Sequence, residues 1–245
     1  MWKELEWVIS LQSYVREGRS RLRKWAFDPK LHIVFRSIGY ALAGFCLSAA
    51  SLGGYAQSLA VGLVWACSGW SAVLAAAGGA TGYLLFWGQA GQQGVVWLAF
   101  SLVMVLLLSG GGIRRGAPLL LPATAGLLVA ATGLAFQIAG EESVPVVIYL
   151  LRVGAGFCVT WLFLRIAAGR NPLLEWFACG VATLALAQIA PIPYFGLGFV
   201  AAAALTAGGA FPAAALAGLG LDLAQVTPVP MILATTAPVM PSCIG

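Results

Sequence analysis

Three ionisable side chains lie inside or beside long apolar stretches of this sequence: Arg152, Glu175 and Asp222. A charge in the hydrocarbon of a bilayer is costly, so such residues are usually paired or belong to a path for ions or substrates. Two chemistries are therefore open: structural ion pairs between neighbouring helices, or a relay for an ion or small substrate. A third interpretation is that the side chains reach the interface without a partner.

Motifs for other chemistry do not occur in the sequence. It contains no GxxxxGK[ST], HExxH or GxSxG pattern and no cluster of acidic residues that would hold magnesium. The five cysteines show no CxxC or Cys/His spacing, so we expect packing residues rather than disulfides or a zinc site. We expect no catalytic residue, no metal and no cofactor in this chain.

The composition decides which elements must position these residues. Hydrophobic residues make up 61% of the 245 residues and charged residues 9%, whereas a soluble domain is about a quarter charged. The apolar runs approach the ~20 residues that cross a bilayer as a helix. They lack the polar alternation of barrel strands, so the backbone must satisfy its hydrogen bonds within helices. The predicted fold is an all-α, polytopic membrane helix bundle.

We predict about 8–10 spans in residues 33–245, some of them short or re-entrant. Their approximate ranges are 33–53, 56–68, 71–87, 95–109, 118–139, 145–167, 173–190, 196–209 and 212–225. Only a few residues separate the second span from the third and the eighth from the ninth. Each of these two pairs is therefore predicted to be a tight hairpin or a broken, partly re-entrant element.

Residues 1–32 form a basic amphipathic arm with apolar residues at near-helical spacing. Such a helix lies at the anionic inner leaflet, while the alternative is a solvated basic arm. We expect its partner to be the lipid bilayer, and we expect no nucleic-acid partner. The basic residues predicted to contact the inner leaflet are Arg16, Arg19, Arg21, Arg23 and Lys24.

The distribution of basic residues predicts the orientation. With the N-terminus in the cytoplasm, the nine predicted spans place every Lys and Arg except Arg152 on the cytoplasmic side, as the positive-inside rule requires. Arg152 then lies about 10 Å from the outer end of its span, at ~1.5 Å per residue. Asp222 also falls near an outer end, so we predict that these two residues pair. Glu175 falls near an inner end, within reach of Arg165 or Arg170.

A weak internal repeat accompanies this pattern. A shift of 140 residues places Tyr55 on Phe195, Gly69 on Gly209 and Gly78 on Gly218. Both segments read as an apolar run, a break at small residues and a second Ala/Gly-rich run. Ala-rich sequences match one another easily, so duplication is a hypothesis; broken elements at corresponding positions are typical of transporters.

Four stretches resemble the membrane region of the stage II sporulation protein E family of endospore-forming bacteria. They are 31–88 (LHIVFRSIGYALAG…YLLFWG), 150–164 (LLRVGAGFCVTWLFL), 171–191 (NPLLEWFACGVATLALAQIAP) and 208–227 (GGAFPAAALAGLGLDLAQVT). In the family an acidic residue opens one span, and Glu175 matches that position. The likeness covers about residues 20 to 230, and it depends on the order of the four pieces more than on any one of them.

The resemblance implies a membrane anchor for a sporulation-specific serine/threonine phosphatase that activates the forespore sigma factor. In the family a cytoplasmic linker mediates self-association and contact with a division protein, and the phosphatase domain binds Mn or Mg. This chain carries none of the family's acidic metal-binding motifs, so we expect an anchoring module truncated before that domain and located at the sporulation septum. The alternatives are a small-solute or ion transporter and a ligand-sensing membrane module.

Overall fold

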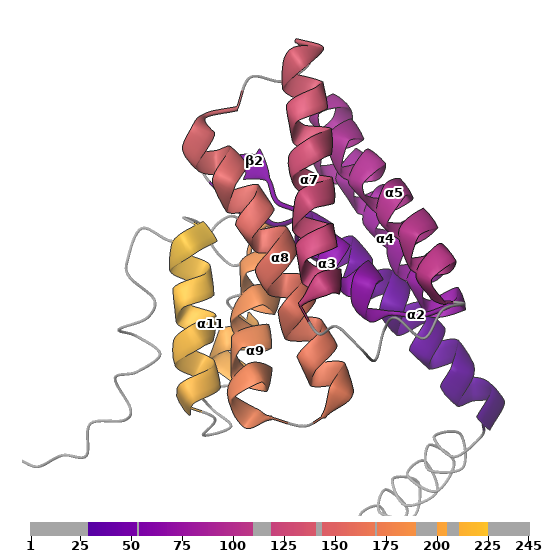
Figure 1. The fold of residues 1–245 in the computed structure, drawn as a ribbon. Helices are drawn as coiled ribbons and strands as arrows, with labels where there is room; N and C mark the ends of the chain where they lie inside the picture. The colour runs from indigo at the N-terminus through magenta and orange to yellow at the C-terminus, as the bar shows by residue number, and fades with distance from the viewer. Residues whose placement is uncertain are drawn as a thin grey trace, which may run out of the picture. The chain divides into compact units, whose positions relative to one another are not determined.

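The computed structural model describes residues 29–52, 54–109, 119–140, 144–169, 171–189, 200–204 and 211–224 (Figure 1). The helices are α2 (Pro29–Ser48), α3 (Leu59–Ala66), α4 (Trp70–Trp87), α5 (Gln92–Ser109), α7 (Leu120–Ile138), α8 (Val146–Ala168), α9 (Pro172–Leu186) and α11 (Phe211–Ala224). Two short strands, β1 (Ser51–Leu52) and β2 (Tyr55–Ala56), and a 3-10 turn, η1 (Gly88–Gly91), complete these elements. The predicted all-α helical class is confirmed.

Several sequence predictions fall outside the described residues. The five basic residues assigned to the inner leaflet, Arg16, Arg19, Arg21, Arg23 and Lys24, lie there, as does most of the predicted arm 1–32. The basic pair Arg114–Arg115 and the residue Arg170 lie there too. The predicted orientation therefore stays a prediction.

Within the part of the chain that the structure describes, three segments are long and apolar enough to cross a bilayer: Trp70–Leu108, Leu120–Ile138 and Val146–Ala168. The first contains two helices, because η1 separates α4 from α5 and Gly88 leaves the helix with a φ of +55°. Each of these helices has 18 residues, about 27 Å at ~1.5 Å per residue. The predicted separate elements over 71–87 and 95–109 are thereby confirmed as helices.

The predicted span over 56–68 is wrong in length. Helix α3 has eight residues, which reach only about 12 Å. The residues before it instead form the hairpin of β1 and β2, in which Ser51 pairs with Ala56 and Leu52 with Tyr55. The first predicted span also ends early, at Ser48 rather than at residue 53. The short α3 and the long α4 are separated by residues 67–69. This break agrees with the broken element that was one of the two alternatives for the predicted pair 56–68 and 71–87.

From Tyr40 to Ser48, helix α2 runs parallel to α4 and in close contact with it. From Tyr40 onward, α2 belongs to the same compact unit as the helices that follow. The contacts advance in the same order along both helices, joining Ala41 to Gly78, Phe45 to Gly82 and Ser48 to Trp87. Because two consecutive long helices point the same way, the segment between them must return the chain. The hairpin and α3 make this return.

The glycines of α4 permit the close approach. A methyl group added at Gly78 would lie closer than 3.0 Å to the backbone of Ala41, and one at Gly82 equally close to Phe45. In lipid, where burial of apolar side chains gives little driving force, such small-residue contacts are what hold helices together.

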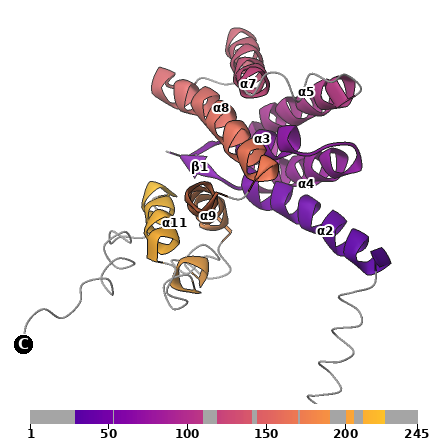
Figure 2. The same cartoon turned by 60° about the horizontal axis from the view of Figure 1, so that its bottom comes forward.

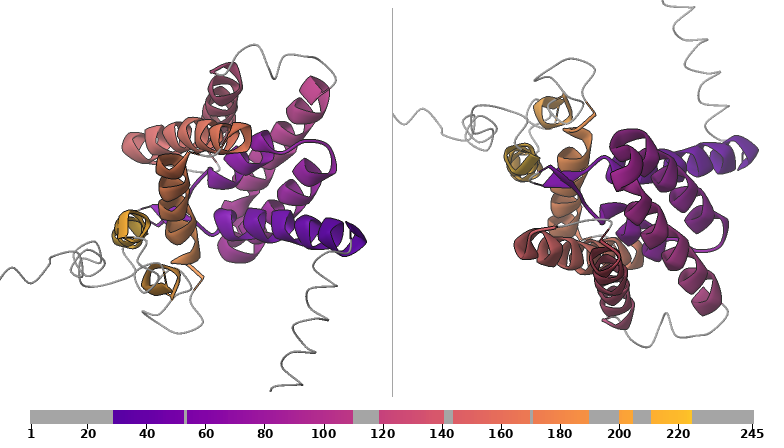
Figure 3. Two further views of the ribbon diagram at one scale, coloured as in Figure 1. Left: turned by 90° about the horizontal axis from the view of Figure 1, so that it is seen from below. Right: turned by 90° about the horizontal axis from the view of Figure 1, so that it is seen from above.

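Of the second predicted broken pair, 196–209 and 212–225, the structure describes residues 200–204 and 211–224. A shift of 140 residues carries α9 onto α2, residues 200–204 onto α3 and α11 onto α4. Helices α9 and α11 lie side by side (Figures 2 and 3). Gly180 contacts Leu216, Gly220 contacts Leu184, and the Thr183 hydroxyl donates a hydrogen bond of 3.2 Å to the carbonyl of Ala217. These contacts advance in the same direction along both helices, which supports the duplication hypothesis.

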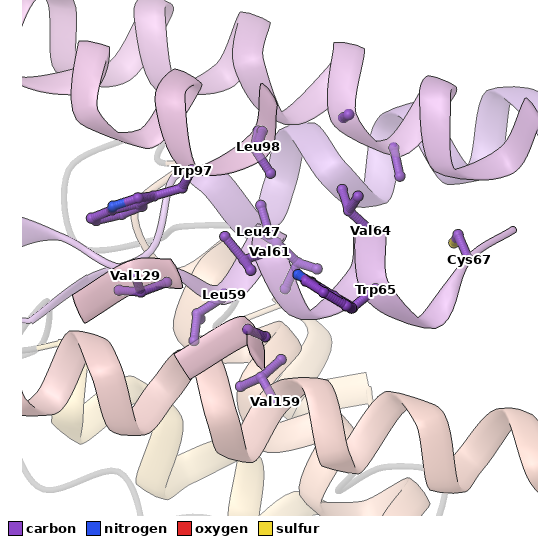
Figure 4. Close-up of a cluster of buried hydrophobic side chains, with 14 of the residues drawn as sticks. Leu47, Leu59, Val61, Val64, Trp65, Cys67, Trp97, Leu98, Val129 and Val159 are labelled. Carbon is purple, nitrogen blue, oxygen red and sulfur yellow. The ribbon is translucent and has the colours of Figure 1, made fainter. Parts of the chain in front are cut away.

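Helix α3 lies at the centre of the core (Figure 4). Six of its eight residues are buried. Leu47 of α2, Trp97 and Leu98 of α5, Val129 of α7 and Val159 of α8 pack around it in one cluster. At Gly62 the helix lies against the backbone of Thr160, leaving no space for a side chain. Side chains from α2, α5, α7 and α8 therefore all pack in one cluster with the short helix α3.

We predict opposite effects for two glycine substitutions within helices. Gly78→Ala should lower the thermal midpoint of the detergent-solubilised chain, because its methyl group overlaps the backbone of Ala41 and overpacking costs about 1–3 kcal/mol. Gly154→Ala is the matched control, since nothing lies within 4 Å of its added methyl group. It should leave the midpoint unchanged or raise it, because alanine favours the helix. Equal midpoints for the two variants would contradict the close α2–α4 contact.

Candidate functional site: a buried arginine centre

Arg152 is buried within the bundle although it carries a charge. Its side chain lies on α8 and is 3% exposed. The guanidinium Nε donates a hydrogen bond of 2.9 Å to the carbonyl of Ala56, and Nη1 donates one of 2.8 Å to Oε1 of Gln93. One cation therefore joins helix α8 to the hairpin and to α5.

Two aromatic rings flank the same guanidinium. Its Cζ lies 5.8 Å from the ring centroid of Tyr55 and 5.5 Å from that of Trp97. A cation over an aromatic face is attracted by the negative face of the ring, and the attraction grows as water is removed. We call Arg152, Ala56, Gln93, Tyr55 and Trp97 the arginine centre.

Hydrogen bonds to the backbone tie the surrounding segments to this centre. The Ser58 hydroxyl donates to the carbonyl of Arg152 at 2.6 Å, although Ser58 is also the N-cap residue of α3. The Tyr83 hydroxyl of α4 donates to the carbonyl of Gln57 at 2.5 Å, and its ring meets Trp97 edge-on at 6.1 Å. The centre thus collects groups from α3, α4, α5, α8 and the hairpin.

The backbone of the hairpin explains why a donor is needed here. In an apolar interior every carbonyl requires a hydrogen-bond partner, and only helices provide one automatically. The amide of Gln57 donates to the carbonyl of Ala50 at 3.0 Å, and Arg152 supplies the donor for Ala56. The guanidinium has five donors in a fixed plane, so it can serve a backbone carbonyl and a side-chain amide together.

Two polar atoms beside the centre have no hydrogen-bond partner among the described residues: Oε1 of Gln57 and Nε1 of Trp97. Both side chains are almost completely buried, at 0% and 1% exposure. The other atom of the Gln57 amide, Nε2, donates to the carbonyl of Tyr55 at 3.2 Å, which orients the amide.

Glu175 and Asp222 have different surroundings from Arg152. Glu175 is exposed in the first turn of α9, where a negative charge is favoured by the helix dipole. The helix begins at the N-cap Asn171, whose side chain accepts a hydrogen bond of 3.1 Å from the amide of Leu173. Asp222 is half-buried on α11, which packs chiefly on α9. The structure therefore does not enclose Glu175 in one buried site with Arg152.

The predicted pairs stay predictions. The contacts described for Arg152 are those of the arginine centre. The predicted pair of Arg152 and Asp222 therefore stays a prediction. Of the two proposed partners of Glu175, Arg170 lies outside the described residues, and Arg165 lies over the ring of Trp161, with Cζ 5.8 Å from the centroid.

Sequence reasoning missed Gln93 and the hairpin. Gln93 lies just outside the predicted span 95–109, in the stretch GQAGQQG, where the sequence does not distinguish its buried amide from the exposed amides of Gln89 and Gln92. Within the described residues no group of three His, Cys, Asp or Glu side chains is arranged to hold a metal.

We predict that Arg152→Lys destabilises the chain, because an ammonium group cannot span the two acceptors and stack between two rings. An unpaired buried acceptor costs about 1–3 kcal/mol, which should lower the midpoint of thermal unfolding in detergent. The control is Arg165→Lys on the exposed end of the same helix, where a change within about 0.5 kcal/mol is expected. A midpoint for Arg152→Lys equal to that of the control would contradict the described centre.

Comparisons with known proteins identify no relative of this chain. No family model matches it, and neither a curated protein nor a solved structure gives a match.

Proposed function

We propose that this chain is a membrane-embedded anchoring and assembly module. The observation that supports it is the use of Arg152, whose guanidinium bonds to the chain's own backbone and side chains at the centre of the bundle. Glycine contacts between α2 and α4 and between α9 and α11 join the remaining helices through their backbones. A module built in this way keeps its long helices packed together in the bilayer.

The finer proposal follows the family resemblance of the sequence. The module anchors a sporulation-specific serine/threonine phosphatase at the asymmetric septum, where that enzyme activates the forespore sigma factor. Its N-terminus lies in the cytoplasm, the basic arm contacts the inner leaflet, and the module self-associates. In the family that the sequence resembles, contact with a division protein and the binding of Mn or Mg belong to cytoplasmic domains. The long apolar helices support membrane insertion. The septal location, the phosphatase and the self-association depend on the family resemblance.

Fluorescence microscopy tests this proposal. The full chain with an N-terminal fluorescent protein, expressed in a sporulating endospore former, should concentrate at the asymmetric septum. A variant with neutral residues in place of Arg16, Arg19, Arg21, Arg23 and Lys24 should stay in the membrane but bind the anionic inner leaflet less, since each basic residue contributes about 1 kcal/mol there. An even distribution of the unaltered fusion around the whole membrane would remove the septal role.

The second candidate is a small-solute or ion transporter. It is favoured by α3 and residues 200–204, two short helical segments that correspond under the 140-residue shift, since such pairs commonly flank a transport site. Such a protein needs a water-filled path to the middle of the bundle. The anchoring module does not.

Thiol labelling separates the two candidates. In a cysteine-free background, Val129→Cys places a thiol at a buried position of α7, beside Gly156 of α8. The anchoring module predicts no reaction with a membrane-impermeant thiol reagent, while Ala139→Cys at the exposed end of α7 reacts. Rapid labelling of position 129 in the intact membrane would favour the transporter.

A further inference from the structure

The hairpin of β1 and β2 has little stability of its own. Each strand has two residues, and an isolated two-stranded hairpin is marginal even when longer. Its chain turns through Gly54, which has a φ of +81° and is exposed, with nothing within 4 Å of an added methyl group. The tip is therefore open to its surroundings, and the hairpin is held at its base.

Contacts to three helices hold that base in place. Arg152 of α8 donates to the carbonyl of Ala56, Tyr83 of α4 donates to the carbonyl of Gln57, and β1 also contacts α11. The first two bonds run from side chains to carbonyls of Ala56 and Gln57, so breaking them removes no backbone hydrogen bond within a helix.

The packed position carries a cost at two side chains. Oε1 of Gln57 and Nε1 of Trp97 are buried without a hydrogen-bond partner among the described residues. Each such atom disfavours the packed state by roughly fivefold to a hundredfold, relative to a state in which the atom is paired. Gln57 follows β2 directly, and Trp97 lies against both Tyr83 and the guanidinium that hold the hairpin.

We propose that the hairpin is a conformational latch with two positions. In the packed position described here it covers the guanidinium of Arg152. In the released position the hairpin separates from α4, α8 and α11, and Gln57 and Trp97 gain hydrogen bonds to water or to each other. Release also frees the guanidinium from the carbonyl of Ala56, so the cation becomes accessible from the end of the bundle where α7 joins α8. The bonds at Ala56 and Gln57 favour the packed position, and the two unpaired atoms favour release.

Hydrogen–deuterium exchange of the full chain in lipid nanodiscs tests the latch. In the unaltered chain, the amides of Ala56 and Gln57 should exchange at least about fivefold faster than those of Val64 in α3 and Leu98 in α5, although all four residues are buried. Exchange of these two amides at the rate of the α3 and α5 amides would overturn the proposal, because no separate release would then occur.

Two matched tryptophan variants test the cause. Trp97→Phe keeps most of the ring and removes the unpaired N–H, so exchange at Ala56 and Gln57 should slow by about fivefold or more. Trp65→Phe is the control, because Nε1 of Trp65 already donates to the Ser101 hydroxyl at 3.1 Å and its loss should not slow that exchange. Unchanged or faster exchange in Trp97→Phe, with the α7 amides still protected, would overturn the proposal.

Discussion

The hydrogen bond from Arg152 to the carbonyl of Ala56 is the interaction on which the rest of this structure depends. A hairpin in an apolar bundle has backbone carbonyls that lack the hydrogen bonds formed within a helix, and hydrocarbon offers no water to donate to them. The guanidinium supplies the missing donor at 2.9 Å, and its positive charge is in turn stabilised by Oε1 of Gln93 and two aromatic faces. A charge that would be costly in lipid is thereby bound on several sides, and an irregular segment becomes part of the core.

The hairpin in turn permits the arrangement of the long helices. Because α2 and α4 are parallel, the chain must return between them within few residues, and a full-length helix would separate them. The hairpin and the eight-residue α3 accomplish the return, so that Gly78 and Gly82 can meet the backbone of α2. The same order of elements recurs 140 residues later in α9, residues 200–204 and α11. This recurrence, with α5, α7 and α8 between the two occurrences, agrees with the duplication hypothesis from the sequence.

Long apolar helices could be predicted from the sequence because hydrophobicity over a helical length is a property of the segment itself. Helices α7 and α8 begin and end within two residues of their predicted ranges, 118–139 and 145–167. Arg152 could be singled out for a related reason, since a charge within an apolar run is visible without a structure. Its partners could not be found in this way. Ala56 takes part through its backbone carbonyl, which every residue has, and Gln93 lies 59 positions away in the chain. The hairpin lies where the predicted spans 33–53 and 56–68 meet, because the segment 51–56 is short and largely apolar and resembles the ends of two spans. Its conformation follows from the tertiary contact with Arg152.

Solid-state NMR of the chain in lipid bilayers, with 15N-labelled arginine and a 13C-labelled alanine carbonyl, tests the central claim most directly. A hydrogen bond between Nε of Arg152 and the carbonyl oxygen of Ala56 places that nitrogen about 4 Å from the carbonyl carbon. We expect a dipolar coupling that corresponds to this distance and that disappears in the Arg152→Lys variant. A spectrum in which the Nε of Arg152 shows no coupling to a backbone carbonyl would contradict the account, because the hairpin would then lack the donor that holds it in the bundle.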